Sequence, residues 1–169
     1  VLQYIADDQQ LRSLTFWMLG SLGGATWEIL KFTTPMMLVT LLMALKLSRQ
    51  LNLLQLGEAE ASHLGVDIER VKRASILSVA LGVGAAVSVS GMIGFIGLVV
   101  PHIVRIAITP NHKVLIPASA LLGAALLLGA DLIARTIVIP SELPVGIVTT
   151  LLGAPVFVSL IVRLRWKLS

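Results

Sequence analysis

The stretch ALLGAALLLGA, residues 120–130, decides the fold of this chain. It is apolar at every position, so it lacks the alternation of polar and apolar residues that a strand of a membrane β-barrel requires. No charged residue occurs between Val114 and Ala130, and a membrane-spanning helix needs about 20 mostly apolar residues. We therefore expect this segment to be a helix inside a lipid bilayer.

The composition of the whole chain also indicates a membrane protein. Of its 169 residues, 56% are hydrophobic and 13% are charged, with a mean hydropathy of +0.94. A soluble domain carries about 25% charged residues, which it needs to cover its surface. The chain has no cysteine, which excludes a disulfide framework and a thiolate metal site. We predict an all-α membrane protein.

About five segments have the length and apolar character of membrane spans. Several are at the short end of the range, so we expect them either to extend into flanking polar residues or to tilt little. The five predicted spans are Phe32–Leu47, Ala74–Ser90, Ile93–Ile108, Val114–Ile133 and Val145–Leu164.

The distribution of basic residues predicts the orientation of these spans. With five crossings the linkers fall alternately on two sides of the membrane, and basic residues favour the cytoplasmic side. The C-terminus is then cytoplasmic, and the sequence pI of about 10.0 needs no nucleic acid to explain it. The predicted cytoplasmic side holds Lys46, Arg49, Arg70, Lys72, Arg73, Arg105, Lys113, Arg163, Arg165 and Lys167, and the outer side holds Arg12, Lys31 and Arg135.

We divide the chain into residues 1–31 and residues 32–169, the second being the spanning region with a cytoplasmic segment at 48–73. Trp17 and Trp27 favour the membrane–water interface, so residues 1–31 are interpreted as an outer interfacial helix and loop, although a plain connecting loop fits equally. The start, VLQYIADDQQ, has no basic region before an apolar core and is not a signal peptide. We expect it to be a cut into a longer chain.

The longest polar stretch, SRQLNLLQLGEAEASHLGVDIERVKR (residues 48–73), separates the first two predicted spans. Ala59 and Ala61 suit a short helix, which Gly65 can close in the left-handed conformation. Asp67 can then cap the next helix. Such a compact element suggests docking to a cytoplasmic partner, but on the residues alone a solvated helical hairpin is the preferred interpretation.

The stretch GMIGFIGLVVPHIVR (residues 91–105) has glycines at Gly91, Gly94 and Gly97. A nucleotide-binding loop would need a preceding soluble strand and a following helix, whereas this one lies between two apolar runs. We predict a tight reversal with close helix contacts. Pro101 removes one backbone hydrogen bond and should kink the third span, and His102 is interpreted as a structural hydrogen-bonding residue.

Asp131 and Arg135 form the sharpest charged pair, spaced i, i+4 at the outer end of the fourth span. Such a pair contributes about 0.3–0.5 kcal/mol in water, so its position matters more than its strength. A local anchor at the interface and a charged rim for a soluble partner are equally compatible with it. In the last span, Thr149 and Thr150 could face a polar path, although hydroxyls in helices more often bond their own backbone.

Four stretches together resemble the iron–siderophore, haem and vitamin B12 importer permeases of bacterial ABC systems. They follow in the family's order and spacing over nearly the whole chain. The resemblance implies the C-terminal half of a ten-span permease that begins near the end of the fifth span. The four stretches are LGEAEASHLGV (56–66), GMIGFIGLVVPHIVR (91–105), NHKVLIPASALLGAALLLGADLIART (111–136) and SELPVGIVTTLLGAPVF (141–157).

The resemblance also implies partners in the bacterial inner membrane and on both sides of it. These are a second permease copy, two cytoplasmic ATPase subunits that use the ATP, and a periplasmic substrate-binding protein, with no cofactor bound by this chain. Residues 55–70 would be the element that couples to the ATPase, and Arg135 would pair with an acidic residue of the binding protein. The positions that match the coupling motif are Gly57, Glu58, Ala61, Leu64 and Gly65.

The sequence favours an importer of an iron chelate over two alternatives. The lead segment, residues 4–27, is most similar to haem permeases, with siderophores and cobalamin as other substrates. An ion-coupled secondary transporter would want carboxylates near the middle of the bilayer, where Asp131 is the nearest candidate. An intramembrane metalloprotease would need an H-E-x-x-H pattern, which is absent, as is any Gly-rich loop ending in Lys-Ser/Thr.

Overall fold

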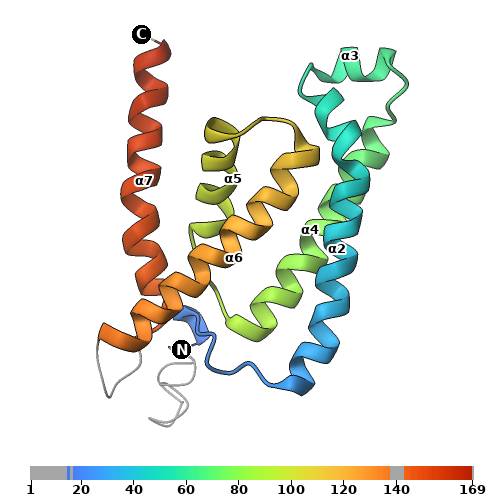
Figure 1. Ribbon diagram of the computed structural model, residues 1–169. Helices are drawn as coiled ribbons and strands as arrows, with labels where there is room; N and C mark the ends of the chain where they lie inside the picture. The colour runs from blue at the N-terminus through green and yellow to red at the C-terminus, as the bar shows by residue number, and fades with distance from the viewer. Residues whose placement is uncertain (1–14, 16, 138–142, 169) are drawn as a thin grey trace, which may run out of the picture. The chain divides into compact units, whose positions relative to one another are not determined.

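The computed structural model describes residues 15, 17–137 and 143–168, and all regular secondary structure in them is helical (Figure 1). This confirms the predicted all-α fold. Arg12 and the side chains of Arg163, Arg165 and Lys167, which the charge count used, lie outside what the structure describes. The labelled helices are α2 (Trp27–Leu54), α3 (Glu58–His63), α4 (Ile68–Ser90), α5 (Ile96–Ala107), α6 (His112–Ile137) and α7 (Val145–Leu168).

Among the described residues, α2, α4 and α6 are long and apolar enough to cross a membrane. Each is longer than the predicted span: α2, for example, has 28 residues and reaches beyond Leu47 to Leu54. Thr26 starts this helix, because its hydroxyl accepts a hydrogen bond from the Ile29 N–H at 3.4 Å. For these three spans, the expected extension into flanking polar residues is confirmed. Their tilt in a membrane stays a prediction.

The predicted third span, Ile93–Ile108, is corrected by the structure. Its helix, α5, has 12 residues and is about 18 Å long, which is less than the roughly 30 Å of a bilayer core. The helix starts only at Ile96, because Gly91 and Phe95 both adopt left-handed backbone conformations with φ of 66°. Part of the predicted span is therefore an irregular turn.

The chain divides into two compact units that interleave along the sequence. One contains the described residues up to Ala25, Val89–Val99 and the chain from Gly123 onward, and the other contains Thr26–Ser88 and Val100–Leu122. The predicted division at residue 31 follows the expected membrane position, and it stays a prediction.

Hydrogen bonds within each unit join linkers to one another, and the side of the membrane on which each linker lies stays a prediction. In the second unit, the Asn52 side chain at the end of α2 bonds Asn111 in the turn before α6. In the first unit, Ser21 N–H donates to the Ser90 carbonyl at 2.9 Å and Met92 N–H to the Trp17 carbonyl at 3.3 Å. Linkers that the charge count assigned to one side thus meet one another.

Glycine permits close backbone contact in the first unit. A Cβ on Gly91 would collide with the Trp17 carbonyl, and one on Gly146 would collide with the Leu19 carbonyl. Nearby, Gly153 leaves room for the side chain of Phe95. The segment before Gly20, the turn at Gly91 and the start of α7 are therefore packed together through small residues, as in many membrane helix contacts.

Gly94 and Gly97 do not share this role. A Cβ built on either would meet nothing within 4 Å, whereas Gly91 combines a left-handed φ with a crowded site. The prediction of a tight reversal is confirmed for Gly91, whereas the described residues make no close contact at Gly94 or Gly97.

In the second unit, α2 and α4 lie side by side (Figure 1). Ser78 donates its hydroxyl hydrogen to the Thr40 carbonyl at 3.2 Å. Close by, a Cβ on Gly82 would lie 2.6 Å from the Thr40 methyl carbon. A small residue and an interhelical hydrogen bond therefore bring the two helices into contact. Both features are common at contacts between membrane helices.

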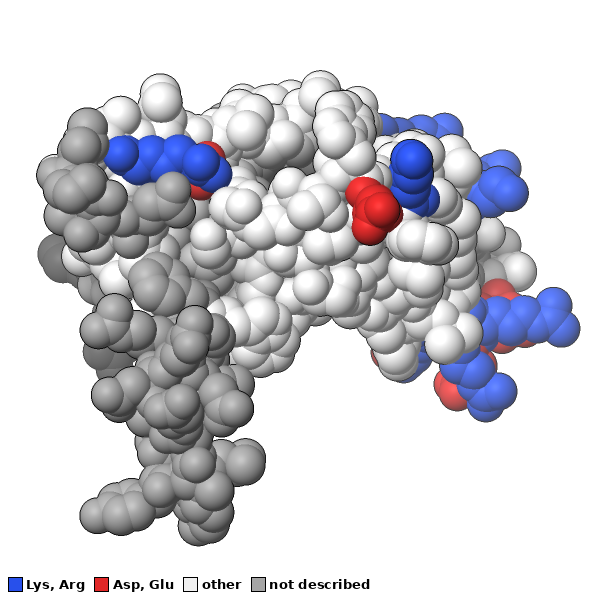
Figure 2. Space-filling model, turned by 90° about the horizontal axis from the view of Figure 1, so that it is seen from below, with Lys and Arg blue, Asp and Glu red and all other residues white. Residues whose placement is uncertain are grey.

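The described helices keep large apolar side chains exposed. Leu121 is 75% exposed and Ile76 68%, while a small core of Ala130, Ala134, Val145 and Val148 joins α6 to α7. Figure 2 shows few charged groups on the face that it presents. A soluble monomer rarely exposes large apolar patches, so helix faces with such exposed side chains fit contact with lipid or further protein.

The turn at Gly91 provides a direct test of this packing. Gly91→Ala in the full-length protein should destabilise it by about 2 kcal/mol, because a left-handed alanine is strained and its Cβ meets the Trp17 carbonyl. Gly94→Ala, three residues away in open space, is the matched control and should be nearly neutral. The measurement is unfolding of the purified protein in detergent; equal midpoints for the two variants would contradict the packing.

Candidate functional site

The residues that match the coupling motif form one compact element around α3. Gly57 precedes the helix with φ of 117°, and Gly65 follows it with φ of 81°. Both values lie in the region that favours glycine, as predicted for Gly65. Ala61 in the middle of α3 is fully buried, and its carbonyl accepts the Val66 N–H at 3.0 Å. The two glycines therefore turn the chain tightly around a buried alanine.

The next helix is fixed to this element by a cap and an ion pair. Asp67 Oδ1 accepts a hydrogen bond from the Arg70 N–H at 3.1 Å, which confirms the predicted cap of α4. Lys72 Nζ lies 2.7 Å from Glu58 Oε1 and so links α4 back to α3. Both side chains are well exposed, so this pair orients α3 more than it stabilises the fold.

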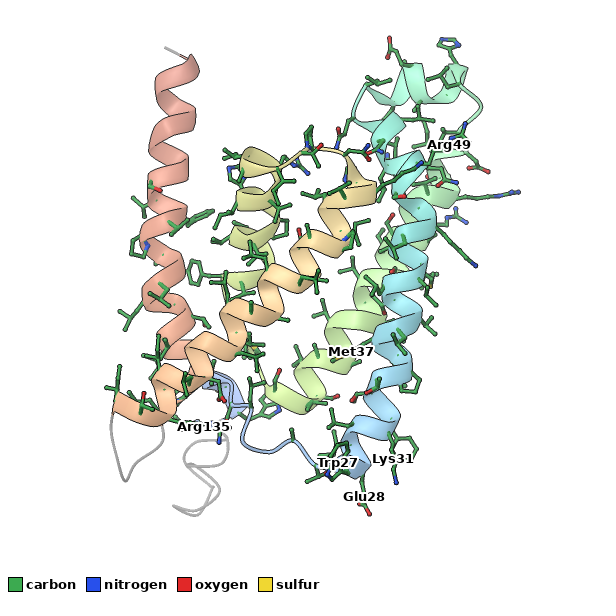
Figure 3. All side chains as sticks on the ribbon, in the orientation of Figure 1. Trp27, Glu28, Lys31, Met37, Arg49 and Arg135 are labelled. Carbon is green, nitrogen blue, oxygen red and sulfur yellow. The ribbon has the colours of Figure 1, made fainter. Side chains whose placement is uncertain are left out.

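Two leucines beside α3 remain exposed to water. Leu56 is 63% exposed and Leu64 59%, although both lie in the polar linker outside the apolar spans. Figure 3 shows α3 across the ends of α2 and α4, with Arg49 on the adjoining part of α2. Exposed leucines on a short, well-ordered element are suited to contact another protein.

A cavity of about 480 Å³ lies beneath this element, within the second unit. Its wall combines apolar and charged side chains from the end of α2, the turn after α3 and the start of α4. The lining residues are Leu47, Arg49, Gln50, Leu53, Leu64, Gly65, Val66, Asp67, Arg70, Val71 and Ala74.

The predicted rim pair is formed at the end of α6. Arg135 Nε donates to Asp131 Oδ2 at 2.8 Å, with the Arg135 side chain 45% exposed and that of Asp131 19% exposed. The carboxylate thus orients the arginine, whose guanidinium still reaches the surface (Figure 3). This geometry allows an approaching acidic group to contact Arg135.

The remaining predicted residues, Thr149, Thr150 and Pro101, lie within helices α5 and α7. Thr149 is buried and its hydroxyl donates to the Gly146 carbonyl of its own helix at 3.1 Å. Thr150 is exposed and lines an apolar pocket of about 500 Å³ with Met92 and Gly94. Pro101 lies inside α5 as predicted. The role of the two threonines in a path stays a prediction.

Within the described residues, no group of three or more His, Asp or Glu side chains could hold a metal ion. Sequence reasoning missed Lys72, whose partner Glu58 is separated from it by a turn of irregular backbone, and it missed the polar contacts of Asn52 and His112. None of these has a spacing that reveals its partner. The helices α2, α4 and α6 extend beyond their predicted apolar spans and include Asn52, Lys72 and His112. A sequence signal that these residues are helical would have been the extension of each span into its polar flank.

The comparisons with known proteins agree with this fold. Residues 1–163 match the model of the FecCD transport family. The chain is 39% identical to a solved structure described as an inward-facing conformation of a metal-chelate type ABC transporter, with a TM-score of 0.87, and the match covers 96% of this chain and 53% of that one. The chain belongs to the FecCD transport family.

Two curated relatives have transport names. The chain is 53% identical over 169 residues to the hemin transport system permease protein HmuU of Yersinia pestis, covering 100% of this chain and 51% of that protein. It is 46% identical over 162 residues to the vitamin B12 import system permease protein BtuC of Vibrio cholerae, covering 95% and 48%. The chain thus spans about half the length of the curated relatives it matches.

The cap of α4 generates a prediction about the candidate site. Asp67→Ala in the full-length protein should destabilise the first turn of α4 by about 1 kcal/mol, because the Arg70 N–H loses its acceptor. Asp67→Asn keeps an acceptor oxygen and removes only an exposed ion pair, so it should cost much less. Amide hydrogen exchange at residues 68–71 measures the difference, and equal protection in the two variants would refute the cap.

Proposed function

We propose that the chain forms part of the permease subunit of an ATP-driven importer in the bacterial inner membrane. The observation that carries the proposal is the compact α3 element, which holds two exposed leucines between two spanning helices. Family membership supports the same reading. The chain would not be an enzyme: ATP hydrolysis would belong to a separate cytoplasmic subunit.

The proposed partners rest on family membership, and the two candidate surfaces are the places where we propose that they bind. The α3 element would seat on a cytoplasmic ATPase, and Arg135 would contact an acidic group of a periplasmic binding protein. A second permease copy and a second ATPase would complete the assembly. In this arrangement α3 and the C-terminus are cytoplasmic, which is the orientation that the basic residues favour.

The proposed substrate is a haem, with ferric siderophores and cobalamin as the other members of the class. The support is the 53% identity with the hemin permease over the full length of this chain. The 46% identity with a vitamin B12 permease supports the wider class of large metal chelates. The part of the relatives that lies beyond this chain would contribute to the path as well.

The ion-coupled alternative receives no support. Asp131, its nearest candidate carboxylate, accepts a hydrogen bond from Arg135 near the end of α6. A carboxylate paired with arginine stays ionised and bound to it, which is unfavourable for a group that must take up and release protons.

The experiment that tests the proposal uses the full-length permease in nanodiscs with the ATPase encoded beside it. Binding protein loaded with haem, ferric siderophore or cobalamin is added in turn, and ATP hydrolysis is measured. Stimulation by one loaded binding protein is expected, and the chelate that stimulates most identifies the substrate. If no ATPase subunit co-purifies with the permease, the proposal fails.

The turn after α3 should control association with the ATPase. Gly65→Pro should weaken co-purification of the ATPase about tenfold or more, because proline fixes φ near −65° while Gly65 requires 81°. Gly65→Asn is the matched control, since asparagine tolerates the left-handed conformation. Membrane insertion should be unchanged in both; an intact complex with Gly65→Pro would contradict the role of α3.

Arg135 should control docking of the binding protein. Arg135→Glu should weaken docking about tenfold or more, because the reversed charge repels both Asp131 and an acidic partner. Basal ATP hydrolysis of the assembled complex should stay at the wild-type level. Thr136→Val, which removes a hydroxyl bonded to its own helix, is the neighbouring control. If Arg135→Glu binds the binding protein with unchanged affinity, the proposed docking role of Arg135 is wrong.

A further inference from the structure

A group of polar side chains joins the end of α2 to the turn between α5 and α6. Asn52 Nδ2 donates to Asn111 Oδ1 at 2.8 Å, and His112 N–H donates to Asn52 Oδ1 at 2.8 Å. Gln55 Nε2 donates to the Pro110 carbonyl at 3.3 Å. We call these five residues the clasp. All of them lie in the second unit.

The orientation of the two asparagine amides follows from backbone donors. Asn111 Oδ1 accepts the Lys113 N–H at 3.0 Å, so this atom must be the oxygen. Asn52 must then present its NH₂ group to Asn111, which leaves its oxygen for the His112 N–H. Both the Nδ2 and the Oδ1 atom of the Asn52 amide therefore have hydrogen-bond partners, and exchanging the two atoms would lose these bonds.

The ring of His112 completes the clasp through its Nδ1, which lies 2.8 Å from Asn52 Oδ1 and 3.1 Å from Gln55 Nε2. Because Asn52 Oδ1 is an acceptor, Nδ1 carries the hydrogen and donates to it. The other tautomer would accept from Gln55, but it would set the lone pairs of Nδ1 and Asn52 Oδ1 against each other. The ring therefore holds the end of α2 through Asn52.

The position of the clasp gives it a mechanical role. Asn52 lies in the last turn of α2, and α3 begins four residues after that helix ends. His112 is the first residue of α6, a continuous helix of 26 residues. A force applied to α3 therefore reaches the end of α2, and the clasp connects that end to the start of α6.

The clasp is distinct from the local capping of α6. Asn111 caps α6 through bonds to residues within a few positions, namely its side-chain bond to Lys113 and its carbonyl bonds to Val114 and Leu115. The bonds of Asn52, by contrast, join positions 59 and 60 residues apart. Loss of Asn52 leaves the bonds of Asn111 to α6 in place and removes the bonds that come from α2, including the acceptor of the His112 N–H.

The geometry points to Asn52 as a positioning residue that transmits movement of the ATPase-bound α3 element to α6 during import. This inference rests on the proposed function. Transmission between packed elements needs a rigid connection, and hydrogen-bonded networks supply one where apolar contacts are sparse. Asn52 makes no contact with ATP or substrate in this role; it keeps two helices moving as one body.

The test compares variants of Asn52 and Asn111 in the full-length permease, reconstituted with its ATPase and binding protein. Asn52→Leu has nearly the same shape and loses the three hydrogen bonds that the Asn52 side chain makes with Asn111 and His112. Substrate imported per ATP hydrolysed should fall about tenfold, since the loss of a few solvent-accessible hydrogen bonds shifts an equilibrium by roughly that factor. Basal ATP hydrolysis and co-purification of the ATPase should remain within about twofold of wild type.

Two aspartate variants separate transmission from folding. Asn111→Asp keeps an acceptor for both Lys113 and Asn52 and suits a helix start, so import per ATP should be close to wild type. Asn52→Asp turns an oxygen toward Asn111 Oδ1, so import per ATP should fall. If Asn52→Leu fails to assemble, the difference in import per ATP between Asn111→Asp and Asn52→Asp still tests the role of Asn52.

Ser48→Ala is the matched control, because Ser48 lies one turn earlier on α2 and its hydroxyl bonds only the Leu45 carbonyl of the same helix at 2.6 Å. It should leave import per ATP unchanged. The inference is overturned if Asn52→Leu imports as much substrate per ATP as wild type. It is also overturned if import falls only in proportion to the amount of assembled complex. A third contradicting result is the same import per ATP in Asn52→Asp and Asn111→Asp. Failure of the wild-type permease to bind any ATPase would instead overturn the proposed function.

Discussion

The rest of the structure depends on the need to satisfy every backbone N–H and C=O group without water. Inside lipid only a helix does this within one segment, and α2, α4 and α6 follow from it. In the described residues, irregular backbone at the Gly91 turn finds hydrogen-bond partners in another segment. The turn at Gly91 and Met92 bonds the segment around Trp17, and the glycines beside α3 lie in the polar linker.

The same constraint explains where charge is found. The apolar lengths of the helices carry almost no ionisable group, and several of the charged side chains near their ends are held in pairs, among them Arg135 with Asp131 and Lys72 with Glu58. Exposed pairs of this kind add little stability. Their value lies in fixing the direction of side chains on the two surfaces that we propose as docking sites.

Composition and pattern were sufficient for the helical fold, for the cap at Asp67 and for the left-handed Gly65, because each depends on local chemistry. They were insufficient for α5, since left-handed Phe95 has no sequence signature and shortens that helix. They also did not separate Gly91 from Gly94 and Gly97. That difference comes from the Trp17 carbonyl, which is distant in sequence. The contacts of Asn52 were hidden for the same reason.

The most direct test of the account is site-specific photo-crosslinking from position 64 in the full-length protein, expressed in cells with the ATPase and the binding protein that we propose as its partners. Leu64 is 59% exposed beside α3, and Leu132, 65% exposed near the end of α6, is the comparison site. The account predicts that a photoreactive residue at 64 crosslinks to the cytoplasmic ATPase while one at 132 does not. Crosslinking of position 64 to the periplasmic binding protein, or to lipid alone, would contradict it.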